Sequence, residues 1–166
     1  MVKRVKVFIS HSAKDVKLVD NLVKFLEGFD IDAYIAERDY KIGRSLSQKI
    51  RQNIDTSDYF LVVYTINGKD SNFVNQEIGY WIDKKRDSDF IPFVEEGLNP
   101  GGFLSGVEYI QFNPLNPNLG HTSVEKYITQ TTKMKEDQAF NNVIGGLGIL
   151  AFIVLVGYGL YRLFKE

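Results

Sequence analysis

Residues 59–65 read YFLVVYT, an apolar run built from aromatic and β-branched side chains. Such a run predicts a strand that is buried on both faces, as strands are in a parallel sheet covered by helices. A loop containing Gly68 follows, and the segment from Phe73 to Asp83 is predicted to be a helix. Glu77 should therefore lie near the start of that helix, beside the carboxyl ends of the strands. Open α/β sheets place their ligand sites at that edge.

The chain as far as about Thr132 alternates strand signals with helix signals. Besides residues 59–65, strands are predicted at residues 4–10, 31–36, 90–94 and 108–112. Helices are indicated by apolar residues at helical spacing: Val19, Leu22, Val23 and Leu26; Leu46, Ile50 and Ile54; and Val124, Tyr127 and Ile128. Ser12 and Asp15 resemble a capping box at the start of the first helix. This alternation predicts a flavodoxin-like α/β fold, with a five-stranded parallel sheet and helices on both faces.

Length and composition limit the classes of function. The chain has 166 residues with 44% hydrophobic content, which suits one compact domain and an extra element. Its 20 Lys and Arg residues balance 21 Asp and Glu residues, so no positive field would attract nucleic acid, and no nucleic-acid partner is predicted. The absence of cysteine excludes a disulfide framework, a thiolate metal site and a cysteine nucleophile.

The C-terminal region carries a long uncharged stretch. No charged side chain occurs from Val143 to Tyr161. A helix continued to Phe164 would be roughly 33 Å long, enough to cross a hydrocarbon core of about 30 Å. A buried core helix is the alternative, but such helices are usually shorter and keep a polar stripe. Tyr158 and Arg162 near its end are typical of a membrane interface. We therefore predict one C-terminal transmembrane helix.

These observations divide the chain into three parts. Residues 1–132 are predicted to form the globular domain, residues 133–142 a polar and charged linker, and residues 143–164 the transmembrane helix. No apolar run occurs at the N-terminus, so neither a signal peptide nor a second span is expected, and the chain should be tail-anchored.

Several familiar sites are missing from the sequence. Neither a GxGxxG motif after the first strand nor a GxxxxGK[ST] motif occurs. The histidines His11 and His121 are far apart and have no carboxylate at metal-ligand spacing, so no metal is predicted. Ser10 and His11 are adjacent on a strand and point to opposite faces, which argues against a serine hydrolase. Ser10 is instead expected to be buried with its hydroxyl bonded to the backbone.

Several motifs, taken in order, resemble those of a TIR (Toll/interleukin-1 receptor) domain. They are VFISHS at residues 7–12, Arg38-Asp39 with Ile42-Gly43, FLVVY at residues 60–64 and FVNQEI at residues 73–78. The run IPFV at residues 91–94 fits the fourth strand of the family, so the resemblance covers about residues 4 to 130. It implies the same five-stranded flavodoxin-like sheet that the periodicity predicts.

The resemblance leaves two kinds of function open. Some TIR domains cleave the nicotinamide–ribose bond of NAD and release nicotinamide with ADP-ribose or a cyclic variant, whereas others only assemble. The enzymatic class carries a glutamate in the helix after the third strand and an aromatic residue one turn before it. Glu77 and Phe73 stand at these positions, although the enzymes most often have tryptophan where Phe73 stands. Residues four apart share a helix face, so Phe73 is expected to wall the pocket of Glu77.

A single carboxylate suits this chemistry. Nicotinamide leaves as a neutral molecule from a cationic substrate, so its departure needs no general acid. The transition state resembles an oxocarbenium ion, which a nearby anion stabilises and whose ribose hydroxyls it can orient. Glu77 is therefore the candidate catalytic residue, and the alternative is a solvated helix carboxylate on the protein surface.

The resemblance also implies residues that contact the nucleotide. His11 and Ser12 follow the first strand, where enzymatic members contact the nucleotide, and Lys41 on the loop from Arg38 to Gly43 is placed to meet a phosphate. The alternatives are a partly exposed loop histidine and a lysine with no specific role. In the family that loop covers the pocket and mediates packing between TIR domains, so self-association is expected. Trp81 is expected in the core rather than as a stacking platform.

Two functions from different classes follow. The first is a membrane-anchored NAD nucleosidase, with NAD as substrate and no cofactor, acting in prokaryotic immune or cell-death signalling such as antiviral defence. The second is a non-catalytic TIR adaptor that recruits other TIR proteins at a membrane. Glu77 with an aromatic residue one turn before it favours the first. In both, the TIR domain is expected to be cytoplasmic on a single-pass anchor.

Overall fold

The computed structural model describes residues 4–35, 48–84 and 89–163, with side chains described as far as Asn142. The chain divides into two compact units, Met1–Ile128 and Thr129–Glu166. The strands are β1 (Val5–Ser10), β2 (Ile31–Ile35), β3 (Tyr59–Tyr64), β4 (Phe90–Glu95) and β5 (Ile110–Phe112). The helices are α1 (Val16–Glu27), α2 (Gln48–Thr56), α3 (Asn72–Lys84) and α4 (Asn118–Leu163), with short 3-10 turns η1 (Ala13–Asp15) and η3 (Gly102–Leu104).

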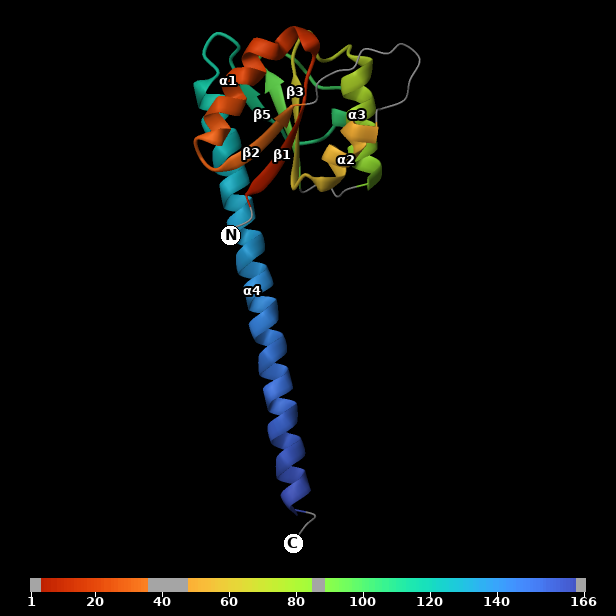
Figure 1. Ribbon diagram of the computed structural model, residues 1–166. Helices are drawn as coiled ribbons and strands as arrows, with labels where there is room; N and C mark the ends of the chain where they lie inside the picture. Colours follow the sequence, from red (N-terminus) through yellow and green to blue (C-terminus); the bar gives the residue numbers. More distant parts are fainter. Residues whose placement is uncertain (1–3, 36–47, 85–88, 164–166) are drawn as a thin grey trace. The chain divides into compact units, whose positions relative to one another are not determined.

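The five strands form one parallel sheet in the order β2-β1-β3-β4-β5 (Figure 1). This confirms the predicted flavodoxin-like sheet with helices between its strands. The last strand begins at Ile110 rather than at residue 108, because only Ile110–Phe112 pair with β4. The first helix is also shorter than its signals suggest, because residues 13–15 form the separate 3-10 turn η1.

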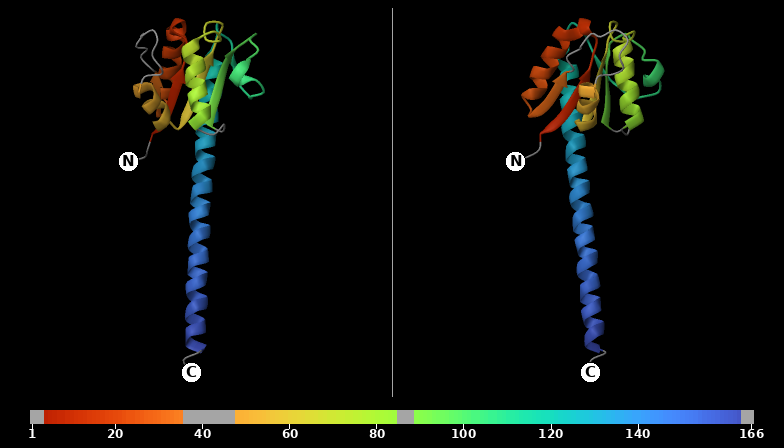
Figure 2. Two further views of the ribbon diagram at one scale, coloured as in Figure 1. Left: turned by 90° about the vertical axis from the view of Figure 1, so that its right-hand side faces the viewer. Right: turned by 45° about the vertical axis from the view of Figure 1, so that its right-hand side comes forward.

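The sheet is buried on both faces, which explains why its central strands are apolar throughout. Side chains alternate along a strand, so Val7 and Ile9 of β1 pack on one side and Phe8 on the other. The first side is covered by α1 and the first turns of α4, and the second by α2 and α3 (Figure 2). Trp81 of α3 is 1% exposed and lies 5.3 Å from the Phe60 ring, measured between ring centroids. The prediction that Trp81 belongs to the core is confirmed.

The first turns of α4 pack against an aromatic pair on the sheet. The rings of Phe93 in β4 and Phe112 in β5 are stacked, with centroids 4.2 Å apart. His121 of α4 is 2% exposed and lies beside Phe93 and Phe25. Burial lowers the pKa of His121, as expected for an imidazole whose charged form is poorly solvated. His121 is therefore a core residue of this domain.

Helix α4 continues into the second unit and runs without a break to Leu163. The predicted linker at residues 133–142 is thus helical, and its side chains are exposed, as its polar composition requires. Among the residues that the structure describes, no helix is both long and apolar enough to cross a membrane. The predicted transmembrane segment at residues 143–164 lies outside the residues whose side chains are described.

Gly120 allows α4 to approach the sheet closely. A Cβ atom added at Gly120 would lie 2.6 Å from Phe112 Cβ and 2.8 Å from Phe93 Cε2. We predict that Gly120→Ala lowers the free energy of unfolding by about 1–3 kcal/mol, because the Phe93 ring and the Cβ atom of Phe112 must shift. Urea unfolding of the 166-residue chain measures this change.

The matched control is Gly101→Ala, because nothing lies within 4 Å of a Cβ atom there. This control should leave stability within about 0.5 kcal/mol of the wild type. Alanine is intrinsically better than glycine in a helix by about 1 kcal/mol. A gain of that size for Gly120→Ala would show that α4 is not in close contact with Phe93 and Phe112.

Candidate active site

The strand order shows where a ligand would usually bind in a sheet of this kind. β1 has β2 on one side and β3 on the other, so the connections that leave β1 and β3 run in opposite directions. Ligands of doubly wound sheets bind outside the carboxyl ends of the strands at this reversal, which in the order 2-1-3-4-5 lies between β1 and β3. Ser10 at the end of β1 is in register with Val62 of β3. Residues 10–12 and 65–67 therefore belong to this edge.

Glu77 is buried at this edge and is bonded to Ser10. Both side chains are 1% exposed, and the Ser10 hydroxyl donates a hydrogen bond to Glu77 Oε2 at 2.5 Å. Ser10 points to the same side of the sheet as Phe8, where α3 packs, and Glu77 lies on the inward face of α3 with Ile78 and Trp81. The alternative of a solvated surface carboxylate is therefore wrong, and so is the expected bond from Ser10 to the backbone. The alternation of β1 explains the second correction, because it turns Ser10 toward α3.

Burial of Glu77 has a physical cost. Carboxylates are almost never fully buried unless they are paired or hydrogen-bonded, because burial removes the water that stabilises their charge. An apolar residue at this position of α3 would pack between Val74 and Ile78 without that cost. A buried carboxylate at the ligand edge of a sheet therefore calls for a chemical role or a specific structural one.

His11 and Ser12 lie at the same edge, between β1 and η1. Both are buried, with exposed fractions of 4% and 7%, so the alternative of a partly exposed loop histidine is wrong. The Ser12 hydroxyl accepts a hydrogen bond from the Lys14 backbone N–H at 3.4 Å and caps η1. Phe73 lies in the first turn of α3 and is half-buried. The structure thus places His11 and Ser12 with the Ser10–Glu77 pair at one edge.

The remaining predicted site residue cannot be placed. Lys41, together with the loop from Arg38 to Gly43, lies outside the described residues. Among the residues that are described, no group of three or more His, Asp or Glu side chains is arranged to hold a metal ion.

A second polar cluster at this edge holds the loop after β3. Asp15 of η1 is 7% exposed and accepts hydrogen bonds from Thr65 Oγ1 at 2.6 Å and from Asn67 Nδ2 at 2.7 Å. On the other side, Glu95 Oε2 at the end of β4 accepts from the Ile66 backbone N–H at 3.0 Å. The loop that leads into α3 is therefore fixed from both neighbouring strand ends.

The sequence did not reveal this role of Asp15. The spacing of Ser12 and Asp15 predicts a capping box, but both carboxylate oxygens of Asp15 bond to the β3–α3 loop instead. The sequence feature that could have indicated these bonds is the run Thr65-Ile66-Asn67-Gly68. It places two polar side chains directly after a buried strand. Gly68 completes the turn, because a Cβ atom there would lie 2.9 Å from the Val63 carbonyl oxygen.

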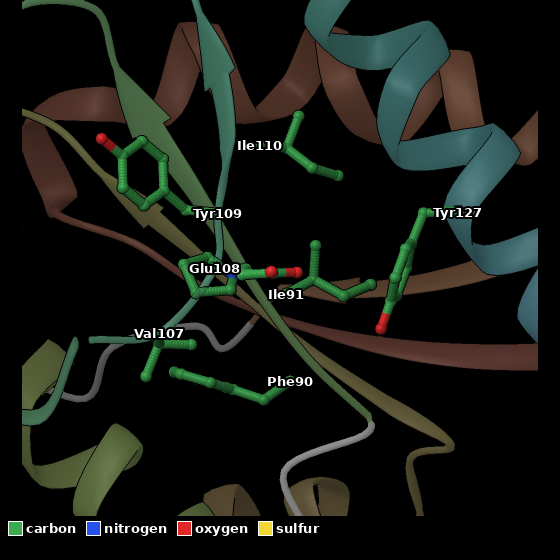
Figure 3. Close-up of a pocket in the computed structure, with 8 residues that line it drawn as sticks. Phe90, Ile91, Val107, Glu108, Tyr109, Ile110 and Tyr127 are labelled. Atoms are coloured by element: carbon green, nitrogen blue, oxygen red, sulfur yellow. The ribbon is translucent and has the colours of Figure 1, made fainter. Parts of the chain in front are cut away.

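In the part of the chain that the structure describes, two cavities are lined by residues other than Glu77. One of about 190 Å³ lies between α3 and η3 and is lined by Tyr64, Lys69, Asn75, Ile78 and residues 101–104. The other, of about 290 Å³, lies at the first residues of β4 and β5 (Figure 3). Glu77 is not among the described residues that line either cavity. Because Glu77 is 1% exposed, a substrate can reach it only after the groups that cover it move.

Comparison with known proteins agrees with this architecture. A family model described as the TIR domain matches residues 7–122. The TIR domain of the Toll-related receptor TRR-2 from Hydra magnipapillata is 23% identical, with a TM-score of 0.53 over 63% of this chain and 82% of that one. A prokaryotic SEFIR domain is 17% identical, with a TM-score of 0.57 over 75% of this chain and 92% of that one.

A more distant structure shares the sheet. The Flv1 flavodiiron core from Synechocystis sp. PCC6803 is 10% identical, with a TM-score of 0.56 over 80% of this chain and 37% of that one. Likenesses at such low identity concern the fold alone. Comparison with curated proteins finds no match.

The Asp15 cluster generates a stability prediction. Asp15→Ala should lower the free energy of unfolding by about 1–3 kcal/mol, because it leaves the buried Thr65 hydroxyl and the Asn67 amide without their acceptor. Chemical denaturation of the 166-residue chain is the measurement. The control is Asp20→Ala on the exposed side of α1, which should change stability by less than about 0.5 kcal/mol. Equal effects of the two substitutions would contradict a structural role for the Asp15 bonds.

Proposed function

This chain belongs to the TIR domain family, and from that premise we propose that it is a membrane-anchored NAD nucleosidase. The observation that carries the proposal is the Glu77 carboxylate, which is buried at the β1/β3 edge and is bonded by Ser10. A buried acid at the ligand edge of a parallel sheet, in a cysteine-free chain, suits a reaction that needs one anion and no nucleophilic thiol.

In the proposed reaction the bond between ribose C1′ and the pyridinium nitrogen breaks. Its electron pair passes to the nitrogen, so nicotinamide leaves neutral and positive charge develops on the ribose. Glu77 stabilises that charge, and a water that then adds to C1′ releases one proton and gives ADP-ribose. A hydroxyl of the adenine-linked ribose that adds to C1′ in place of water, with loss of its proton, gives a cyclic product instead. Ser10 fixes the orientation of Glu77 through Oε2, which lets the carboxylate act without reorganisation.

Neighbouring residues have supporting roles in this proposal. Phe73 lies one turn before Glu77 on α3 and is half-buried, so it can wall the nicotinamide-ribose part of the pocket. His11 and Ser12 lie beside Ser10 and are proposed to contact the nucleotide. Lys41, which lies outside the described residues, is proposed to meet a phosphate. Entry of NAD requires a rearrangement that exposes the carboxylate of Glu77.

The same burial supports a second candidate. A carboxylate that is 1% exposed and already hydrogen-bonded can simply join α3 to β1. The chain would then be a non-catalytic TIR adaptor that recruits other TIR proteins. The substitution Glu77→Gln distinguishes the two candidates. An enzyme would lose activity with the charge of Glu77, whereas an adaptor needs only a stable fold.

We further propose that the domain is held at a membrane by residues 143–164 and that it self-associates there. The support is the absence of charged side chains from Val143 to Tyr161, together with the exposed, charged helix at residues 133–142 that precedes this stretch. Confinement to a membrane raises effective concentration and can strengthen assembly by about 10²–10⁴ without any new contact. Immune or cell-death signalling, including antiviral defence, is the proposed setting, with the TIR domain cytoplasmic.

Nicotinamide release from NAD by the 166-residue chain tests the reaction. Glu77→Gln keeps the shape of the buried side chain and one acceptor oxygen for the Ser10 hydroxyl, and it removes the charge. It should lower kcat by about 10²–10³. Ser10→Ala should lower kcat by about tenfold with KM unchanged, because it loosens the carboxylate without touching the substrate. At position 77, glutamine is preferable to alanine. The Glu77 side chain is 1% exposed, so alanine would leave a cavity in its place.

Asp83→Asn is the matched control, since Asp83 is an exposed carboxylate on the same helix. It should retain full activity. Absence of nicotinamide release by the wild-type chain, with Glu77→Gln as stable to unfolding as the wild type, would contradict the enzyme and support the adaptor. Full activity in folded Glu77→Gln would remove Glu77 from the mechanism.

Membrane attachment is tested by flotation with lipid vesicles. The 166-residue chain should float with the vesicles, whereas a chain ending after residue 132 should remain at the bottom of the gradient, because it lacks the uncharged segment. A second measurement tests assembly. If assembly is required, the rate of nicotinamide release per molecule should rise with the density of protein on the vesicles. Flotation of the shortened chain would show that residues 143–164 are not the anchor, and a constant rate per molecule would argue against assembly.

A further inference from the structure

The larger cavity lies at the edge of the sheet opposite to Ser10 and Glu77. It is lined by Phe90, Ile91, Pro92, Val107, Glu108, Tyr109, Ile110 and Tyr127. The first three of these begin β4 and Ile110 begins β5, so the cavity lies at the amino ends of these strands. Ser10 and Glu77 belong to the carboxyl edge. A ligand in this cavity would therefore not occupy the candidate active site.

The floor of the cavity is apolar and its rim is aromatic. Phe90 and Ile91 are buried in the sheet, with exposed fractions of 7% and 3%. Tyr109 and Tyr127 are 43% and 37% exposed and come from opposite sides, one from the segment before β5 and the other from α4. Figure 3 shows the Tyr127 ring edge-on, with its flat face turned toward Ile91 and Glu108. An apolar group in the cavity would thus be flanked by ring surfaces.

The cavity carries one acidic side chain. Among the described residues that line it, Glu108 is the single carboxylate, and none is a lysine, an arginine or a histidine. Figure 3 shows the Glu108 carboxylate pointing toward the side of the cavity where Ile91 and Tyr127 lie. An anionic ligand would be repelled by this group, and a neutral apolar ligand would gain nothing from it.

We infer that this cavity binds a small organic cation that bears an alkylated ammonium group. The faces of aromatic rings attract cations, and quaternary ammonium ligands are recognised by aromatic side chains in this way. Methyl groups on the nitrogen would pack on Phe90 and Ile91, while Glu108 would neutralise the charge. The volume of about 290 Å³ lies at the lower end of the usual range for ligand pockets and suits a small molecule.

Choline is a suitable probe, because its neutral isostere 3,3-dimethylbutanol has the same shape without the charge. Saturation-transfer NMR with the 166-residue chain in detergent measures the binding of each. We expect choline to bind saturably and its isostere to bind about tenfold more weakly, because the isostere lacks the charge that the ring faces and the Glu108 carboxylate attract. Equal binding of the two molecules, or no saturable binding of choline, would overturn the inference.

Variants then locate the site. Glu108→Gln should weaken choline binding by about tenfold, and Tyr127→Leu should weaken it through loss of the ring face. Asp20→Asn, an exposed carboxylate on α1 that does not line the cavity, should leave binding unchanged. Glu108 is exposed, so Glu108→Gln should fold normally, and circular dichroism checks this. Choline binding that survives both Glu108→Gln and Tyr127→Leu would place the cation elsewhere and contradict the assignment.

Discussion

A carboxylate buried between a sheet and a helix needs a hydrogen-bond donor, and Ser10 supplies one to Glu77 at 2.5 Å. This bond joins the end of β1 to the second turn of α3 at a point where both side chains are 1% exposed. Glu77 shares the buried face of α3 with Val74, Ile78 and Trp81, where a carboxylate is costly unless it is hydrogen-bonded, so the bond from Ser10 favours this packing of α3. The bond also gives the carboxylate one orientation, which a catalytic anion requires.

The strand order makes this pair possible. Because β1 and β3 are neighbours with connections that run in opposite directions, the loop after β3 carries α3 across the end of β1. Asp15 and Glu95 then hold that loop from its two sides, through Thr65, Asn67 and the Ile66 amide. The candidate active site therefore rests on a rigid strand end, a fixed loop and a packed helix. Sites built on such elements are more precise than sites carried by free loops.

Much of the fold followed from sequence patterns because its central strands are buried on both faces. Runs such as residues 59–65 have one stable environment, the inside of a parallel sheet, and the spacing of Val19, Leu22 and Leu26 allows one buried helix face. The position of Glu77 after the third strand also followed from this reasoning. Its burial did not, because the partner Ser10 lies 67 residues away, and local patterns cannot show such pairing. The bond from Thr65 to Asp15, 50 residues apart, was missed for the same reason.

The most direct measurement is a structure of this chain with an NAD analogue whose ribose–nicotinamide bond cannot be cleaved. A reactive role for Glu77 predicts that the nicotinamide-bearing ribose lies within hydrogen-bond distance of the Glu77 carboxylate, with Ser10 still bonded to Oε2 and Phe73 against the bound molecule. An analogue that binds elsewhere, while Glu77 stays covered between β1 and α3, would contradict that role and leave the Ser10–Glu77 pair as a structural link.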